Sequence, residues 1–212
     1  MTNNFIKVAL LIVSLLYSLP TYSNEVINSS VHHLSDGTYA NTSGVAYESS
    51  FNKLLKWSWE RRSKNLETFE FEVEVPNYKE IYENENIVTT WIGHETFLYQ
   101  NKDINVLTDP HFTQRASPLN FAGPKRYMAP GMKIDDLPNI DVVTISHSHY
   151  DHLDYMSVKL LAEKFDNILF LVPLGLKKWF ESKGIYNVRE LDWWDSLIIQ
   201  KTLITFAPVQ HW

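Results

Sequence analysis

Short apolar or alternating runs recur through the second half of the chain and predict a series of strands. The strands are expected at residues 87–91, 95–99, 105–108, 142–145, 168–172, 188–191 and 203–207. Two segments carry apolar residues three and four positions apart, which predicts helices at 157–165 and 174–183. Because strand and helix alternate after residue 142, we predict an α/β fold.

The first part of the chain has a different pattern. Residues 24–44 are polar, apolar positions from Phe51 to Trp59 predict a helix, and residues 68–76 alternate as in a half-exposed strand with its glutamates in solvent. Trp57, Trp59, Arg61 and Arg62 belong either to a helix that packs on the core, which we favour, or to a patch that contacts a membrane surface.

The extreme N-terminus has the pattern of a secretory signal. Lys7 precedes an apolar run at 8–16, and Pro20 and small residues up to Ser23 follow it. The run is short for a membrane span. We therefore expect a signal peptide at 1–23, an extension with a helix and a strand at 24–86, and the main domain at 87–212. The predicted destination is the periplasm or outer-membrane surface of a bacterium.

Composition narrows the chemistry. The 212 residues are 44% hydrophobic, which is enough for one globular core. A net charge of −6 argues against a nucleic acid partner, which would require a basic face. The sequence has no cysteine, so any metal must be held by histidine, aspartate or glutamate.

Chemistry-bearing residues concentrate directly after the predicted strand at 142–145. Three of the eight histidines fall within six residues there, as His147, His149 and His152, with Asp151 beside them. In an extended segment the side chains of His147 and His149 point to the same side and can hold one metal ion. Imidazole and carboxylate suit zinc. The alternative is a loop rich in solvated histidine, and an H-x-H-x-D-H string after a buried strand makes it the weaker interpretation.

This string and a series of further motifs resemble the metallo-β-lactamase superfamily. In order, the others are WIGHET at 91–96, LTDPHF at 107–112, RASP at 115–118, GPKR at 123–126, LDWW at 191–194 and PVQHW at 208–212. The series is similar to the branch that contains the N-acylphosphatidylethanolamine-hydrolysing phospholipase D and its bacterial relatives. The resemblance covers about residues 88–212 and implies an αβ/βα sandwich, present here as its N-terminal half and the start of the second half.

The resemblance also implies roles for individual residues. His147, His149 and His211 would hold the first of two zinc ions, and Asp151 and His152 the second, with Asp151 as the candidate catalytic residue. Asp109 would orient a metal-binding histidine from behind. His94 would lie near the site without being a ligand.

A long irregular stretch at 112–130 is expected to be functional, since loops of this length usually are. The resemblance implies that it borders the substrate cleft. Arg115, Lys125 and Arg126 would meet a phosphate there, or else form ordinary surface ion pairs. The two interpretations have equal weight.

The resemblance implies a zinc-dependent hydrolase of phospholipase D type. A metal-bound water would attack the phosphodiester of an N-acylphosphatidylethanolamine-like phospholipid, and other small esters or phosphodiesters are the wider substrate class. A lactonase or β-lactam hydrolase is one alternative. The superfamily has two further motifs, a bridging aspartate and a last histidine, beyond the position of Trp212. We therefore expect either a fragment of a longer enzyme or a truncated, inactive or partner-dependent metal-binding remnant.

Overall fold

A computed structural model of the chain describes residues 32–41, 56, 59–60, 86–119 and 121–209. The predicted signal peptide, the strand at 68–76, most of the helix at 51–59 and His211 lie outside the described residues. Trp59 is described and is 76% exposed, so the structure does not support its predicted place in a core. None of the described helices has both the length and the apolar character needed to cross a bilayer.

The chain divides into two units, at 1–40 and 41–212. In the first unit, residues 32–40 form a turn that is closed by a bridge between His33 and Tyr39. The second unit contains the sheets and helices described below.

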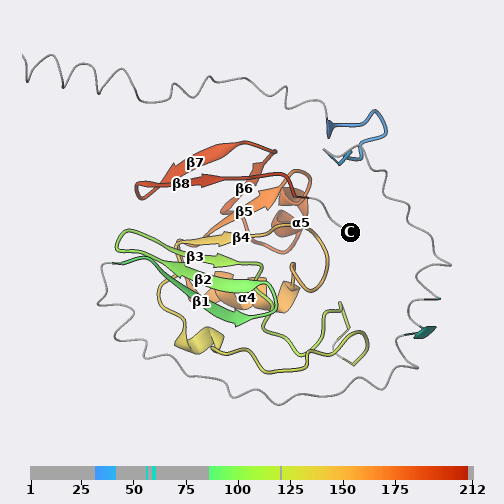
Figure 1. Cartoon of the computed structure of the whole chain (residues 1–212), viewed down its shortest axis with the longest axis horizontal. Coiled ribbons are helices and arrows are strands. Elements are labelled where there is room, and N and C mark those ends of the chain that lie inside the picture. The colour runs from blue at the N-terminus through green and yellow to red at the C-terminus, as the bar shows by residue number, and fades with distance from the viewer. Residues whose placement is uncertain (1–31, 42–55, 57–58, 61–85, 120, 210–212) are drawn as a thin grey trace, which may run out of the picture. The chain divides into compact units, whose positions relative to one another are not determined.

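A six-stranded sheet forms the centre of the second unit (Figure 1), with the strand order β1-β2-β3-β4-β5-β6. Strands β1, β2 and β3 pair antiparallel, and β3, β4, β5 and β6 pair parallel. Their bounds are β1 Val88–Gly93, β2 Thr96–Gln100, β3 Asn105–Thr108, β4 Val142–Thr144, β5 Leu169–Pro173 and β6 Val188–Leu191. These strands match the predicted positions within one or two residues, and the α/β class is confirmed.

Alternate residues of the central strands enter two different cores, because successive side chains of a strand point to opposite faces. Val143, Phe170 and Val172 face the core that α4 (Tyr155–Lys164) and α5 (Lys177–Ser182) cover. Val142 and Leu171 face the opposite core. The sheet is therefore buried on both faces, as its apolar strands require.

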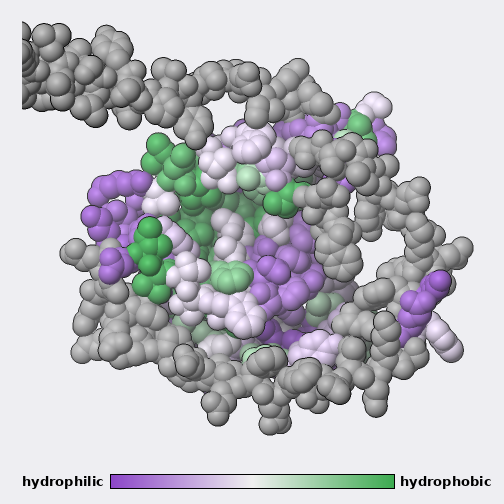
Figure 2. All heavy atoms as spheres, in the orientation of Figure 1, coloured by the Kyte–Doolittle hydropathy of each residue, from purple (hydrophilic) through white to green (hydrophobic). Residues whose placement is uncertain are grey.

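A two-stranded hairpin, β7 (Ser196–Ile199) and β8 (Thr202–Thr205), covers the second core. Its Leu197, Ile199 and Ile204 pack inward, whereas Ile198 and Leu203 pair on the outer face and are 76% and 63% exposed. Figure 2 shows hydrophobic surface over this hairpin. The sequence predicted β8 but not β7, because Ile198 on the outer face of Ser196–Ile199 is as apolar as Leu197 and Ile199 and breaks a strict alternation.

The helices differ from their predicted bounds for local reasons. Helix α4 begins two residues early because Asp154 caps it, its side chain accepting from the Met156 N–H at 3.3 Å. Helix α5 begins three residues later than predicted, because Gly175 has a φ of +90° that a helix cannot include. A short 3₁₀ helix, η2 (Ile134–Asp136), lies between β3 and β4.

Candidate metal centre

The candidate residues meet at one edge of the large sheet. Because β2 runs antiparallel to both neighbours and β4 runs parallel to β3, the strands β1, β3 and β4 all point the same way. The residues that follow them are His94 after β1, Asp109 after β3, and the segment 146–152 after β4. Carboxyl ends of parallel strands are where ligands bind in sheets of this kind.

Asp109 lies beneath the cluster and organises it. Its Oδ1 accepts from the Ser146 N–H at 2.7 Å, and its Oδ2 accepts from the Ser146 hydroxyl at 2.7 Å and lies 2.9 Å from His152 Nδ1. The residue is 7% exposed and has a φ of +35°, a region that residues other than glycine rarely adopt. Asp109 therefore fixes the His152 ring, with Nε2 directed away from the carboxylate.

His147 and His149 form a second pair of nitrogen donors. His147 Nε2 lies 3.0 Å from His149 Nδ1, and the His147 and His152 ring centroids are 4.0 Å apart. The His149 carbonyl accepts from the N–H groups of His152 and Leu153, so the segment turns back on itself. Two ligands of one zinc ion lie roughly 3–3.5 Å apart, and the spacing of this pair fits one shared ion.

Asp151 lies between two histidines. Its Oδ2 is 3.0 Å from His94 Nε2 and 3.8 Å from His152 Nε2. The ligand atoms of His94, Asp151 and His152 all lie within 4.8 Å of one another. Sequence reasoning placed His94 near the site but did not predict it to be a ligand. The sequence feature that could have indicated the contact of His94 with Asp151 is its position directly after β1, which points the same way as β4.

The carboxylates and imidazoles of this cluster shift each other's pKa values. Burial alone would lower the pKa of His152, but the hydrogen bond to Asp109 and the charges of Asp109 and Asp151 raise it above its ordinary value. Burial would raise the pKa of Asp151, yet hydrogen bonding and the nearby His152 and His94 hold it below its usual value. The lowered pKa keeps Asp151 ionised. The carboxylates that favour a proton on His152 form a negative environment that would also favour a metal cation in place of that proton.

Asp154 connects the start of the 112–130 loop to α4. Its Oδ2 accepts from the Thr113 N–H at 3.1 Å and from the Ser157 hydroxyl at 2.6 Å, and Ser157 Oγ accepts from the Phe112 N–H at 2.8 Å. Asp154 is 6% exposed. It is therefore a structural anchor beside the cluster.

The three predicted phosphate-binding residues lie in different surroundings. Arg126 donates to the carbonyls of His111 (2.6 Å) and Met128 (2.7 Å), so its guanidinium holds the loop together. Arg115 donates to the Gly123 carbonyl at 2.6 Å. Lys125 is exposed and pairs with Arg115 only through the backbone. Lys125 and the Arg115 donors that make no hydrogen bond to the described residues remain the candidates for a phosphate.

His111 was not predicted to have a role. It is 4% exposed, and within the described residues neither ring nitrogen has a hydrogen-bond partner. Its ring centroid lies 6.1 Å from that of His94 in an edge-on arrangement. Burial lowers the pKa of His111, so the ring is neutral at physiological pH.

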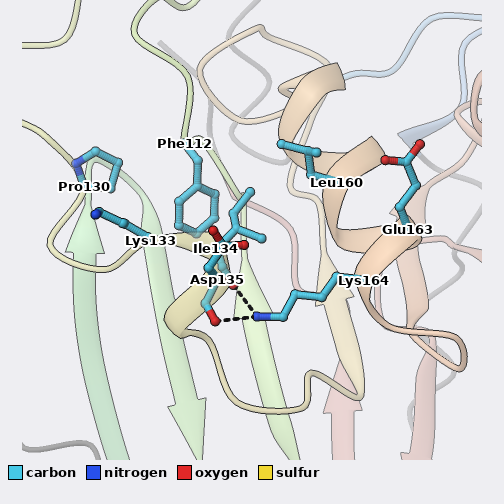
Figure 3. A pocket seen from close by; sticks show the side chains of 8 residues that line it. All are labelled: Phe112, Pro130, Lys133, Ile134, Asp135, Leu160, Glu163 and Lys164. Carbon is cyan, nitrogen blue, oxygen red and sulfur yellow. Dashed lines mark hydrogen bonds between the residues drawn. The ribbon is translucent and has the colours of Figure 1, made fainter.

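A groove beside α4 lies apart from the cluster (Figure 3). Phe112, Ile134 and Leu160 give it an apolar floor, and Lys164 donates to the carbonyls of Ile134 (2.6 Å) and Asp135 (2.8 Å). Lys164 is therefore used to hold η2 against α4. The residues that line the groove include none of the predicted metal ligands.

Comparisons with known proteins agree with this geometry. A family model described as "Beta-lactamase superfamily domain" matches residues 104–212. The chain is 40% identical over 141 residues to the N-acyl-phosphatidylethanolamine-hydrolyzing phospholipase D 1 of Caenorhabditis elegans, which covers 62% of this chain and 40% of that protein. It is 31% identical over 123 residues to a UPF0173 metal-dependent hydrolase of Solibacter usitatus, which covers 58% of this chain and 46% of that protein.

A solved structure is also similar. The isothiocyanate hydrolase from Delia radicum gut bacteria superposes with a TM-score of 0.43 and 21% identity, over 53% of this chain and 44% of that chain. The present chain spans less than half the length of the curated relatives it matches, from 27% to 46%.

Proposed function

This chain belongs to the beta-lactamase superfamily, and we propose that its site binds two zinc ions and hydrolyses a phosphodiester bond. The observation that carries the proposal is the network at the sheet edge. Asp109 holds the His152 ring at 2.9 Å, while His147 and His149 present ring nitrogens 3.0 Å apart. A buried carboxylate behind a histidine is the usual support of a metal ligand.

The imidazole nitrogens and the carboxylate of the cluster are ligand types that suit zinc. His147 and His149, together with the predicted ligand His211, would hold one ion, and Asp151 and His152 would hold the other. When bound, zinc lowers the pKa of a water toward about 7 and polarises the scissile group. The chain's own residues position the donors: Asp109 fixes the His152 ring, and Asp154 fixes the loop that borders the site.

The proposed substrate is an N-acylphosphatidylethanolamine-like phospholipid. Support comes from the relative of that name, at 40% identity over 141 residues. Further support comes from the exposed Lys125 and from Arg115 on the 112–130 loop, which begins at the cluster. A cationic side chain there would bind a phosphate oxygen. Arg126 is better assigned to holding the loop.

The test uses the full chain, treated with EDTA and then reloaded with Zn²⁺. It is incubated with N-acylphosphatidylethanolamine in mixed micelles, and mass spectrometry follows release of N-acylethanolamine and phosphatidic acid. A lactone and a chromogenic β-lactam are assayed in parallel, with the double variant His147→Ala/His149→Ala as the control. Zinc-dependent release that the double variant loses supports the proposal. Turnover of only the lactone or β-lactam overturns the substrate class. Zinc binding without any turnover overturns the enzyme assignment and favours a remnant or partner-dependent chain.

We also propose that the chain is exported. The support is the order of charge, apolar run and small residues over residues 1–23. Intact mass spectrometry of the chain expressed in a bacterium checks this. A product that begins after Ser23 supports export, and a product that retains Lys7 contradicts it.

A further inference from the structure

Three ligand-type side chains from two separate loops converge on one point of the sheet edge. His94 comes from the β1–β2 turn, and Asp151 and His152 come from the loop after β4. Nearly sixty positions of sequence separate His94 from Asp151, yet His94 Nε2 lies 3.0 Å from Asp151 Oδ2. We propose that His94 is a third protein ligand of the ion held by Asp151 and His152. The proposal rests on the two-metal function above and extends its ligand set.

The three donors have the spacing that one ion requires. Their candidate atoms lie within 4.8 Å of one another, with Asp151 Oδ2 3.0 Å from His94 Nε2 and 3.8 Å from His152 Nε2. Ligand atoms around a first-row ion lie roughly 3–3.5 Å apart, because each bond is about 2.0–2.2 Å. The distance of 3.8 Å between Asp151 Oδ2 and His152 Nε2 is the one that an ion would have to shorten.

The backbone holds His94 in this position. Gly93 has a φ of +139°, and His94 itself has a φ of +52°. The Trp91 indole N–H donates to the His94 carbonyl at 2.8 Å and closes the turn. A Cβ atom at position 93 would lie 3.0 Å from Arg126 Nη2. These contacts restrict the conformation of the turn. In that conformation the His94 imidazole points toward Asp151.

The His152 ring is also oriented by a protein contact, without any ion. Because Asp109 engages His152 Nδ1, the other ring nitrogen, Nε2, is directed toward Asp151. The side chains of His94, Asp151 and His152 are 44%, 37% and 16% exposed, so the group is open on one side. A substrate or solvent molecule can reach an ion there.

The set of two imidazoles and one carboxylate is a complete catalytic ligand set. Such sets hold catalytic zinc or non-haem iron with three protein ligands and leave open positions for the reaction. All three donors of the proposed set lie within residues 94–152. The hydrogen bond between His94 and Asp151 is the contact that the ion would replace.

The experiment measures metal binding by the full chain and not turnover. The chain is treated with EDTA, dialysed and titrated with Co²⁺, and visible absorption follows occupancy. His94→Ala should weaken one class of Co²⁺ site by at least about tenfold, the size expected for loss of a ligand or its support. Glu95→Gln is the matched control, since it removes a neighbouring charge but no donor of the group, and it should change affinity less than about threefold.

The variant His94→Cys gives a direct spectroscopic test. The natural sequence has no cysteine, so a thiolate-to-cobalt charge-transfer band in the near ultraviolet can come only from position 94. Appearance of that band with one bound Co²⁺ supports the proposal. Unfolding temperatures in EDTA, which should be unchanged because His94 is exposed, show that the variants are folded.

The outcomes separate this proposal from the proposed function. Wild-type affinity in His94→Ala together with no charge-transfer band in His94→Cys overturns the role of His94, and zinc-dependent hydrolysis would still stand. Loss of one Co²⁺ class in His94→Ala with the band present supports the role of His94, even in a chain that hydrolyses none of the substrates tested.

Discussion

Two neighbouring parallel strands, β3 and β4, each deliver a histidine to the same edge of the sheet, and the two histidines have opposite surroundings. His152, after β4, lies 2.9 Å from the Asp109 carboxylate and borders Asp151. His111, after β3, is 4% exposed, and its ring nitrogens have no partner within the described residues. The His152 ring is held by polar contacts, whereas the His111 ring is buried and has no such contact within the described residues.

The backbone around His111 nevertheless makes its hydrogen bonds. The His111 N–H donates to Thr96 Oγ1 at 3.0 Å, Thr96 Oγ1 donates to the Asp109 carbonyl at 2.8 Å, and Arg126 donates to the His111 carbonyl. The end of β3 therefore serves as a scaffold, and the end of β4 supplies donors to the cluster. A histidine near the site is thus a candidate ligand only where its ring is oriented by a partner.

The largest effect is expected from Asp109→Ala. The change would leave the Ser146 N–H without its buried acceptor and release the His152 ring. We expect the free energy of unfolding to fall by about 2–4 kcal/mol, because the partly buried hydrogen bonds of Ser146 and His152 to a buried carboxylate would be lost. Zinc affinity should fall roughly 10–100-fold. Urea unfolding in EDTA and competition with a zinc chelator measure the two effects.

Asp109→Asn is the matched control for that change. Asparagine tolerates the φ of +35° and can still accept from Ser146, but it carries no charge beside His152. It should therefore recover most of the stability and little of the zinc affinity. Equal recovery of both would show that Asp109 acts on the fold alone.

Asp154→Ala should have an intermediate effect that is confined to stability. The change removes the cap of α4 and the acceptor for Thr113 and Ser157. We expect a loss of about 1–2 kcal/mol in unfolding free energy. Zinc affinity, measured in the same variant, should stay within about threefold of the wild type. A larger loss of zinc affinity would place Asp154 among the groups that orient the cluster.

His111→Phe should have a smaller effect of opposite sign. Phenylalanine has a similar ring and no polar nitrogen to leave unpaired, so we expect a gain of about 1 kcal/mol in unfolding free energy at pH 7.5. Chemical denaturation of the EDTA-treated chain measures it. A loss of stability comparable to that of Asp154→Ala would mean that the His111 ring has a partner in solution, such as a buried water.

The sequence predicted the sheet well because its central strands have simple patterns. Val142 and Val143 in one strand and Phe170–Val172 in the other are apolar and buried, so each strand contains a short continuous apolar run. The hairpin strand Ser196–Ile199 was missed because its outward Ile198 is as apolar as its inward neighbours. Burial of the inward side depends on the second core, which no local pattern reveals.

Sequence reasoning proposed candidate ligands where they are close in sequence, and it did not anticipate the contacts that strands bring together. His147, His149, Asp151 and His152 form one string. The contact of His94 with Asp151 depends on β1 and β4 pointing the same way, across two intervening strands. The use of Arg126 for the carbonyls of the loop also depends on tertiary structure, because its charge suits a phosphate equally well.

The smallest predicted effect concerns pH and further distinguishes the two histidines. Burial lowers the pKa of His111 below its ordinary value of 6.5, so the folded chain keeps the ring neutral where the unfolded chain binds a proton. Above pH 6.5 the ring is neutral in both states. As pH falls below 6.5, protonation of His111 in the unfolded chain lowers the free energy of unfolding. In EDTA, the stability advantage of His111→Phe over the wild type should grow between pH 7.5 and 5.5, by at most about 1.4 kcal/mol. The raised pKa of His152 acts in the opposite direction, but it is common to both chains and cancels in the difference. A difference that stays constant with pH would show that His111 takes up a proton in the folded chain as readily as in the unfolded one, and the ring would then resemble His152 more than its burial indicates.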